Sequence, residues 1–397
     1  MIESLINIIF NYNNFIYWYI SLYIIVFFTI ITGITNFLWL KNIPSEKNNT
    51  DSKLVSILIP ARNEADVIES TIKSITNQSY QNYELIILDD NSSDATKSII
   101  QKHAKSNHKI EQINGLPLPS GWLGKNWACH QLSEKAKGEY ILFMDADTNI
   151  DKFILQDSII AIQKEKIDLL TLVPGRDTKL IADHAMKKII SWFIVCWLPM
   201  KLAINLNAPF LSATFGQFML FKKSSFTQIG GFIAIKDNPV DDFQLGRNIK
   251  KNLFKWMLYD AAFRITTRTY NTNKDLISGY SKNIFPAVGY SISIFLIIFL
   301  ILLSFVLGST IPIILYFLGL LHNQELILLC ITLLMLLFIS WEIVTIRFKY
   351  SIFTPFSFPI LISLILLLAL RSFIDNVFYS STWKGRSYRT DKKKLKI

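Results

Sequence analysis

The stretch Leu54-Val-Ser-Ile-Leu-Ile-Pro-Ala-Arg-Asn-Glu64 decides the fold of this chain. Its apolar run predicts a buried strand, which passes directly into a polar loop. A helical pattern follows, with Val67, Ile68, Ile72 and Ile75 at roughly three- and four-residue spacing. A strand that leads through a loop into a helix is the first unit of a parallel α/β sheet.

Two further apolar runs end in carboxylates. Tyr83-Glu-Leu-Ile-Ile-Leu-Asp-Asp90 ends on Asp89 and Asp90, and Gly138-Glu-Tyr-Ile-Leu-Phe-Met144 leads into Asp145-Ala-Asp147. Parallel sheets bind ligands at the carboxyl ends of their strands. Paired carboxylates there suit a hard cation such as Mg²⁺ or Mn²⁺, which keeps several waters and clamps phosphates. The first turn lacks the glycine-rich dinucleotide fingerprint, which argues against a nicotinamide cofactor.

The composition is too apolar for an ordinary soluble protein, with 51% hydrophobic and 18% charged residues. The apolar residues are concentrated towards the two ends of the chain. Phe15 to Leu40 carries no charge over 26 residues, which is long enough to span a bilayer. A cleaved signal peptide is the alternative, but the stretch has no basic start and a poor cleavage site. We therefore expect a retained anchor.

The C-terminal part predicts further spans. Ile284 to Leu321 is free of charge over 38 residues and is interrupted by Gly308-Ser-Thr-Ile-Pro312. It forms either one long span with a re-entrant piece or two spans in a tight hairpin. Leu326 to Ile346 and Tyr350 to Leu370 follow as further spans. Four spans after residue 283 are expected.

The charges near the spans predict the orientation. Only Glu3 precedes the first span, whereas Lys41, Lys47 and Lys53 follow it, so the central domain is expected to face the cytoplasm. The tail after Trp383 holds seven basic residues and one acidic residue, a net charge of 7 − 1 = +6, and is expected on the same side. An even number of spans must then follow residue 283.

These observations divide the chain into four parts and place it in the cell membrane as a multi-pass protein. The predicted parts are an N-terminal transmembrane anchor (1–40), a cytoplasmic α/β domain (41–283), C-terminal transmembrane helices (284–378) and a basic cytoplasmic tail (379–397).

The overall charge does not point to nucleic acid. The net charge is +11, but much of it lies in the tail and beside the spans, where it serves topology and contact with anionic lipid. The sequence has no basic groove interleaved with aromatic residues. Its three cysteines are far apart, and its five histidines lack metal-ligand spacing, so neither predicts a metal site or a disulfide framework.

Three more segments complete the pattern. A loop rich in Gly and Trp, 119–131, contains Trp122 and Lys125, and a third carboxylate pair, Asp241 and Asp242, is interpreted as another strand end. The segment Ile189 to Leu202 is interpreted as a helix that lies on the membrane. Lysines bracket only 12 of its residues, which is too few to cross.

From Leu54 to about Tyr270 the chain resembles the family 2 glycosyltransferases, inverting enzymes with a GT-A nucleotide-sugar-binding fold. The motifs occur in that family's order and spacing. Trp122-Leu-Gly-Lys-Asn-Trp-Ala128 and Trp383-Lys-Gly-Arg-Ser-Tyr388 are similar to its membrane-bound branch, which includes hopene-associated and carotenoid (diaponeurosporenoate) glycosyltransferases. The resemblance implies a mixed, mostly parallel sheet with flanking helices, joined to transmembrane helices at both ends.

The resemblance also implies roles for single residues. Asp242 would be the general base with Asp241 as its neighbour, and Asp147 would hold Mg²⁺ or Mn²⁺ together with Asp145. Gly216, Gln217 and Trp122 would lie on the acceptor side. The remaining residues would bind the donor, a UDP-sugar: Pro60, Ala61, Arg62, Glu64, Asp89, Asp90, Lys125 and Asp145.

These roles suit an inverting sugar transfer, which needs one base for the acceptor and positive charge beside the leaving diphosphate. The expected reaction moves one hexose, with glucose as the expected sugar, from a UDP-sugar to an apolar membrane lipid such as a carotenoid acid or a hopanoid.

Two alternatives remain. A processive polysaccharide synthase would carry a Gln-x-x-Arg-Trp-like motif after the base, which the segment Arg247 to Trp256 lacks. A non-catalytic scaffold or transporter is disfavoured because Asp90, Asp147 and Asp242 are all present.

Overall fold

The computed structural model describes residues 12–45, 52–268, 270–378, 381–383 and 386–388. It divides the chain into two compact units. Unit 1 comprises residues 1–39, 180–201 and 271–397, and unit 2 comprises residues 40–179 and 202–270. Most of the predicted basic tail (379–397) lies outside the described residues.

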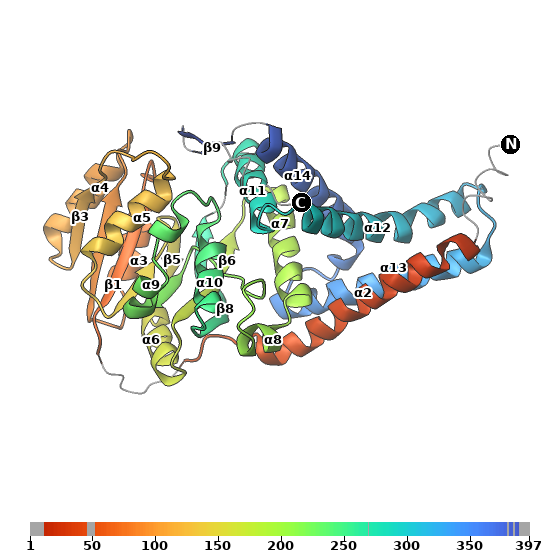
Figure 1. The fold of residues 1–397 in the computed structure, drawn as a ribbon, viewed down its shortest axis with the longest axis horizontal. Coiled ribbons are helices and arrows are strands. Elements are labelled where there is room, and N and C mark those ends of the chain that lie inside the picture. Colours follow the sequence, from red (N-terminus) through yellow and green to blue (C-terminus); the bar gives the residue numbers. More distant parts are fainter. Residues whose placement is uncertain (1–11, 46–51, 269, 379–380, 384–385, 389–397) are drawn as a thin grey trace. The chain divides into compact units, whose positions relative to one another are not determined.

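Unit 2 is built on an eight-stranded mixed sheet in the order β3-β2-β1-β4-β7-β6-β8-β5 (Figure 1). The pairs β1/β2, β2/β3, β1/β4 and β6/β8 are parallel, whereas β4/β7, β6/β7 and β5/β8 are antiparallel. The strands are β1 (Val55–Ala61), β2 (Tyr83–Asp89), β3 (Ile110–Asn114), β4 (Tyr140–Phe143), β5 (Thr148–Ile150), β6 (Leu169–Asp177), β7 (Met219–Lys222) and β8 (Trp256–Arg268). The α/β fold with a mostly parallel sheet is therefore confirmed.

Helices follow the strands as the periodicity predicts. Among them, α5 packs on β1 and β2, α6 on β6, and α10 on β8. The helices of this unit are α3 (Ile68–Thr76), α4 (Thr96–Ser106), α5 (Gly124–Lys135), α6 (Ile154–Lys164), α9 (Lys223–Gln228), the 3₁₀ turn η2 (Ile233–Ile235) and α10 (Asp241–Lys251).

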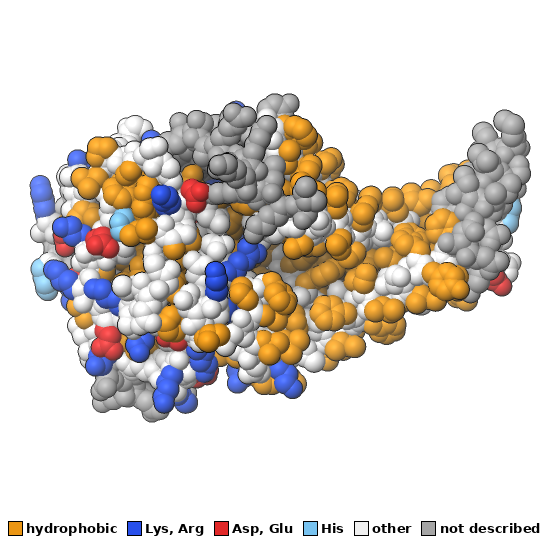
Figure 2. All heavy atoms as spheres, in the orientation of Figure 1, with side chains coloured by type: hydrophobic (Ala, Val, Ile, Leu, Met, Phe, Trp, Pro, Cys, Tyr) orange, Lys and Arg blue, Asp and Glu red, His pale blue; other side chains and the backbone are white. Residues whose placement is uncertain are grey.

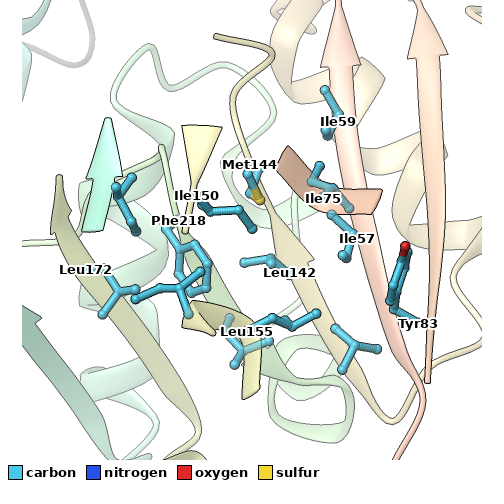
Figure 3. Close-up of a cluster of buried hydrophobic side chains, with 14 of the residues drawn as sticks. Ile57, Ile59, Ile75, Tyr83, Leu142, Met144, Ile150, Leu155, Leu172 and Phe218 are labelled. Carbon is cyan, nitrogen blue, oxygen red and sulfur yellow. The ribbon is translucent and has the colours of Figure 1, made fainter. Parts of the chain in front are cut away.

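The core of unit 2 lies between this sheet and its helices. Figure 3 shows alternate residues of β1, Ile57 and Ile59, beside Leu142 of β4 and Phe218. Each of these side chains has no exposed surface. Full burial of a large apolar side chain contributes about 1.5–3 kcal/mol, so this core holds the strand ends of the sheet rigidly in register.

Unit 1 is helical. It contains α2 (Tyr12–Trp39), α7 (Ile181–Trp192), the π-helical turn η1 (Phe193–Trp197), α11 (Asn273–Ala287), α12 (Ile292–Phe317), α13 (Gln324–Phe348), the 3₁₀ turn η3 (Pro355–Ser357), α14 (Phe358–Phe378) and the two-stranded ribbon β9 (Ser381–Trp383) and β10 (Arg386–Tyr388). The short helix α8 (Met200–Asn205) leads from unit 1 into unit 2. Hydrophobic side chains cover α2, α12 and α13 (Figure 2).

Four helices are long and apolar enough to cross a membrane: 15–39, 292–317, 324–348 and 355–378. Apolar helices at both ends are therefore confirmed, but the expected number after residue 283 is wrong. The described residues contain three such helices there instead of four, because 284–321 forms α11's end and one continuous helix, α12.

The continuity of α12 has a specific cause. Pro312 has no N–H, so it cannot donate to the carbonyl of Gly308 four residues earlier. Tyr19 of α2 fills that place, because its hydroxyl donates to Gly308 O at 2.7 Å. The backbone acceptor that the proline leaves free is thus satisfied by a neighbouring helix, as an apolar environment requires.

The segment 189–202 also differs from the expectation of a single surface helix. It consists of the end of α7, the π turn η1 and the start of α8. Trp192 is 1% exposed and stacks on Trp341 of α13 with ring centroids 5.0 Å apart. Its Nε1 donates to Ser340 Oγ at 2.8 Å. Much of this segment therefore packs inside unit 1.

Candidate active site

The carboxyl ends of three parallel strands meet at one edge of the sheet. Ala61 at the end of β1 is in register with Asp89 at the end of β2. Beyond β4, Met144 N donates to Leu58 O at 3.1 Å, which continues the pairing towards Asp145. The loops that carry the predicted donor residues therefore leave the sheet side by side.

The loops after β1 and β2 are tied to each other. Arg62 Nη1 donates to Asp90 O at 2.8 Å and lies 3.8 Å from Asp90 Oδ2. Asn63 Oδ1 accepts from Ser93 N at 2.8 Å. Asn63 and Asn91 have left-handed φ angles of 53° and 54°, which asparagine tolerates better than most residues. Pro60 and Ala61 form the last two residues of β1, directly before this loop.

Asp89 carries a side-chain oxygen that has no partner in the part of the chain that the structure describes. Its side chain is 3% exposed, and among the described residues its Oδ1 has no hydrogen-bond donor. A buried polar atom without a partner is costly, and such atoms in folded proteins call for an explanation such as a ligand. Asp89 Oδ1 is therefore a buried acceptor at this edge that no donor among the described residues satisfies.

Lys125 at the start of α5 joins two groups of carboxylates. Its Nζ lies 2.8 Å from Asp145 Oδ1 and 3.5 Å from Asp241 Oδ2. A Cβ added to Gly216 would lie 3.5 Å from both Lys125 Nζ and Asp242 Oδ2. Lys125, Asp145, Asp241, Asp242 and Gly216 therefore form one cluster, called here the lysine–carboxylate cluster.

The sequence did not predict the pairing of Lys125 with carboxylates, and the resemblance placed this lysine among the donor-binding residues only. Burial by itself would lower the pKa of Lys125, but attraction by Asp145 and Asp241 outweighs it and raises that pKa well above its usual value. Lys125 is therefore held in its charged form. Because its carboxylate partners lie far from Lys125 in the sequence, no local pattern identifies them.

Asn126, which the sequence analysis did not single out, fixes the position of Lys125. Its Nδ2 donates to Ile235 O and Asn238 O, both at 2.9 Å. These two carbonyls belong to the segment that leads into Asp241. Asn126 thereby couples the start of α5 to the start of α10, across more than one hundred residues of sequence.

The sequence pattern predicted that Asp241 and Asp242 end a strand, and this prediction is wrong. They form the first turn of α10, where a negative charge interacts favourably with the helix dipole. Asp242 Oδ2 accepts from Gly216 N at 3.1 Å, and its Oδ1 accepts from Phe243 N at 2.8 Å. Both oxygens of Asp242 are thus oriented by backbone donors.

Two carboxylates of the site have raised pKa values. Burial raises the pKa of Asp242 to about 7, assisted by repulsion from Asp241 and opposed by Lys125. Burial likewise raises the pKa of Asp147 to about 7, assisted by repulsion from Asp145 and Glu64. Raised carboxylate pKa values in one place are typical of catalytic and ligand-binding sites.

A cation would relieve the repulsion at Asp147. Among the described residues, no group of three or more His, Cys, Asp or Glu side chains has the geometry of a metal site. Two carboxylates are nevertheless enough for Mg²⁺ or Mn²⁺, which completes its shell with water and substrate phosphates. Asp147 and Asp145 are therefore the candidate ligands, with Asp145 also paired to Lys125.

The remaining predicted residues lie around this cluster. Trp122 stacks on His130, with centroids 5.2 Å apart, and makes an edge contact with Trp127 at 5.1 Å. Gln217 is half-buried and follows Gly216 directly. Trp122 precedes α5 and its ring contacts are with Trp127 and His130 of that helix, so its position on the acceptor side stays a prediction.

Comparison with known proteins agrees with this geometry. Residues 56–230 match the model of the family described as glycosyl transferase family 2. The chain is 22% identical over 256 residues to 4,4'-diaponeurosporenoate glycosyltransferase of Staphylococcus haemolyticus, which covers 64% of this chain and 66% of that protein. It is 36% identical over 115 residues to the β-monoglucosyldiacylglycerol synthase of Trichormus variabilis, which covers 28% of this chain and 24% of that protein. The chain thus spans less than two-thirds of the length of these curated relatives.

One solved structure is similar over nearly its whole length. The mannosyltransferase PcManGT of Pyrobaculum calidifontis, solved in complex with GDP-Man and Mn²⁺, superposes with a TM-score of 0.55 at 13% identity, covering 95% of this chain and 99% of that one. This likeness confirms the expected GT-A fold with its apolar helices. Residues 56–230 therefore match a family 2 glycosyltransferase domain, and the chain has the GT-A fold.

Proposed function

We propose that this protein is an inverting, non-processive glycosyltransferase that moves one hexose, with glucose the expected sugar, from a UDP-sugar to an apolar membrane lipid. The observation that carries the proposal is the lysine–carboxylate cluster, which joins an oriented carboxylate to a charged lysine at the ligand-binding edge of the sheet. Lys125, Asp145 and Gly216 of this cluster lie within residues 56–230, which match the family 2 model, and Asp241 and Asp242 follow shortly after them in a chain with four long apolar helices.

Asp242 is assigned the role of general base. The acceptor oxygen attacks the anomeric carbon, the bond from that carbon to the diphosphate oxygen breaks, and the acceptor proton passes to Asp242. A pKa of about 7 leaves a substantial fraction of the carboxylate free to accept a proton at neutral pH. The donors Gly216 N and Phe243 N hold it in one orientation.

Asp241 is assigned to positioning. Its Oδ2 lies 3.5 Å from Lys125 Nζ, so it anchors the lysine and orders the first turn of α10. Asp241 thereby links the lysine to the turn of α10 that carries the base. Preorganised charge of this kind needs no rearrangement during the reaction.

The donor is assigned to the loops after β1, β2 and β4. Asp90 and Arg62 would bind the nucleoside, with Asp89 Oδ1 as a further acceptor for a hydroxyl or N–H. Lys125 would place positive charge beside the leaving diphosphate. A divalent cation held by Asp147 and Asp145 would neutralise more of that charge when bound.

The acceptor class rests on the apolar helices and on the relatives. The names of the two curated relatives state a carotenoid acid and a glucosylated diacylglycerol as their molecules. An apolar acceptor dissolved in the bilayer suits a chain with four helices long enough to span it. We assign the protein to the cell membrane, with unit 2 facing the cytoplasm, where nucleotide sugars are made.

The test compares Asp242→Asn with Asp241→Asn in the full-length protein. Asp242→Asn keeps the size of the side chain but cannot take the proton, so turnover should fall by about 10²–10⁴-fold while UDP-sugar affinity stays the same. Asp241→Asn should lower turnover less. Near-normal turnover of Asp242→Asn, or loss of donor binding in step with activity, would show that the base is assigned wrongly.

The acceptor is tested separately by mass analysis of lipids. Cells with the wild-type chain should contain a lipid class that carries one added hexose, and cells with the Asp242→Asn chain should lack it. Incubation with other UDP-hexoses in place of UDP-glucose decides the sugar. If no lipid gains a hexose while a soluble acceptor does, the lipid assignment is wrong.

A further inference from the structure

The helices α2, α12 and α13 of unit 1 have a common register. Tyr19 of α2 bonds to Gly308 of α12, and a Cβ added to Gly308 would lie 3.3 Å from Leu333 of α13. Further along, Thr29 Oγ1 donates to Ser340 Oγ at 3.3 Å. The helix α2 therefore runs parallel to α13, and α12 runs antiparallel to both.

This bundle has two ends that differ in their connections. The end formed by Trp39 of α2, Ile292 of α12 and Phe348 of α13 is called here the proximal end, because the chain enters unit 2 at Leu40 directly after Trp39. The turn between α12 and α13, residues 318–323, marks the distal end.

Both ends of α14 contact the proximal half of the bundle. Phe356, just before α14, makes an edge contact with Phe338 of α13 at 4.8 Å. Near the other end of α14, Phe373 stacks on Phe295 of α12 at 5.1 Å. Phe285 at the end of α11 contacts Phe373 at 5.2 Å. A helix that crossed the bilayer would bring its two ends to opposite ends of the bundle.

The inclination of α14 follows from these contacts. Since Gly308 faces Leu333, Phe295 lies at the level of about residue 346 of α13, which is roughly 12 Å along the axis from Phe338 at 1.5 Å per residue. The path along α14 from Phe356 to Phe373 is about 26 Å by the same rise. The helix is therefore inclined by roughly 60° to the bundle, whereas transmembrane helices tilt by about 20° and seldom beyond about 40°.

The two faces of α14 have different surroundings. One face packs along α11, where Phe285 N donates to Ser372 Oγ at 2.9 Å (Figure 1). The other face exposes Ile360, Leu367 and Phe378, at 74%, 68% and 70% of their surface. An apolar helix covered by protein on one side and open on the other lies at the edge of the helical unit, with its open face available to lipid.

We propose that α14 does not cross the membrane but lies obliquely in the leaflet at the proximal end, with its exposed face against lipid acyl chains. Three helices then cross, two of them after residue 283. The residues beyond α14 emerge on the same side as unit 2, which agrees with the basic charge of 384–397, because seven basic residues against one acidic residue favour the surface of anionic lipid. This inference does not depend on the proposed reaction.

The first experiment labels single added cysteines with a membrane-impermeant maleimide in sealed vesicles of one orientation. The reporters are Lys97→Cys in unit 2, Gln324→Cys at the distal end and Lys394→Cys in the tail. The native cysteines Cys129, Cys196 and Cys330 are buried, and unmodified protein gives the background. Lys394→Cys should label together with Lys97→Cys and oppositely to Gln324→Cys. Labelling of Lys394→Cys together with Gln324→Cys would overturn the proposal.

The second experiment measures the depth of spin labels along α14 in bilayers. Ile360→Cys, Leu367→Cys and Phe378→Cys lie on its exposed face, and the first and last are separated by about 27 Å along the helix. A helix inclined by roughly 60° changes depth by about 13 Å over this distance, and a transmembrane helix tilted by about 20° changes depth by about 25 Å. A label on Leu367→Cys at the bilayer centre, with the other two in opposite leaflets, would contradict the proposal.

Discussion

At the scale of single residues, the site depends on how one lysine is shared. Lys125 pairs with Asp145 on the donor side and with Asp241 beside the assigned base. Without it, the carboxylates of the cluster would repel one another in a buried place, which is costly. Burial is the main reason why the pKa of Asp242 is raised, Asp241 raises it further and Lys125 lowers it, so both neighbours adjust the pH at which the base becomes active.

The first prediction concerns pH. A base must be deprotonated to act, so a pKa of about 7 for Asp242 predicts that kcat/KM rises with pH and levels off above about 7. Asp241→Asn removes the repulsion that helps to raise this pKa, so the acidic limb of its profile should move to lower pH. The measurement is the pH profile of both proteins at saturating donor. If the acidic limb of the Asp241→Asn profile stays at the wild-type pH, Asp242 is not the group whose titration controls kcat/KM.

The second prediction concerns the metal. Asp147→Asn removes a carboxylate of the assigned cation site, so metal-dependent binding of UDP-sugar, measured by calorimetry, should be lost together with turnover. Chelation of the wild-type protein should have the same effect, and excess Mn²⁺ or Mg²⁺ should reverse it. Full activity in excess chelator would refute a metal-dependent mechanism.

At the scale of secondary-structure elements, function depends on close approach between helices and their neighbours. Gly246 lets α10 pack directly on Thr214, because a Cβ at this position would clash with Thr214 Oγ1. The first turn of α10 carries Asp242, so the packing of this glycine sets the position of the base. The helix α12 depends in the same way on Tyr19, which satisfies the carbonyl that Pro312 leaves free.

The third prediction is a change in α10. Gly246→Ala should displace the helix and cost about 1–3 kcal/mol of stability. Misplacement of the base should lower turnover by about 10- to 100-fold, with donor affinity retained. Thr214→Ala removes the clashing oxygen, so the double variant should recover part of the turnover. If Gly246→Ala turns over as fast as wild type, α10 does not position the base through this contact.

The fourth prediction is a change in α2. Tyr19→Phe leaves Gly308 O without a donor and should destabilise the helical unit by about 1 kcal/mol, seen as a lower Tm in detergent. Pro312→Ala restores the backbone N–H, so the same change of Tyr19 should cost less in that background. Equal costs in both backgrounds would show that the hydroxyl acts in some other way.

At the scale of the whole molecule, a charged α/β unit and an apolar helical unit are combined in one chain. Charged side chains gather on the surface of unit 2, whereas α2, α12 and α13 present hydrophobic side chains (Figure 2). The donor is charged and soluble, and the assigned acceptor is apolar, so each unit has the surface chemistry of one substrate. The segment after the base, Arg247 to Trp256, lacks a chain-gripping Gln-x-x-Arg-Trp-like motif, and Gln244-Leu-Gly-Arg247, which overlaps its start, is followed by Asn248 instead of Trp.

The fifth prediction concerns the product and follows from the absence of a chain-gripping motif after the base. Each acceptor should gain a single hexose even after long incubation with limiting acceptor and excess UDP-sugar. Mass spectrometry of the lipid product over time is the measurement. A ladder of masses that extends by successive hexoses would favour the processive synthase instead.

The sequence by itself determined the elements of this protein and the chemistry at their ends. Apolar runs that end in Asp89 and Asp145 predicted parallel strands with a ligand-binding edge, and both strands are present. Long uncharged stretches predicted the apolar helices. These features follow from residues close together in the chain, because periodicity and local charge are properties of neighbours.

Only the tertiary structure decided which distant residues meet. It paired Lys125 with Asp145 and Asp241, began α10 at Asp241, and joined Tyr19 to Gly308 so that α12 continues past its proline. The inclination of α14 could likewise not be predicted from the sequence, since the composition of this helix matches that of a transmembrane helix. Such features depend on packing between segments far apart in the chain, which leaves no local pattern to read.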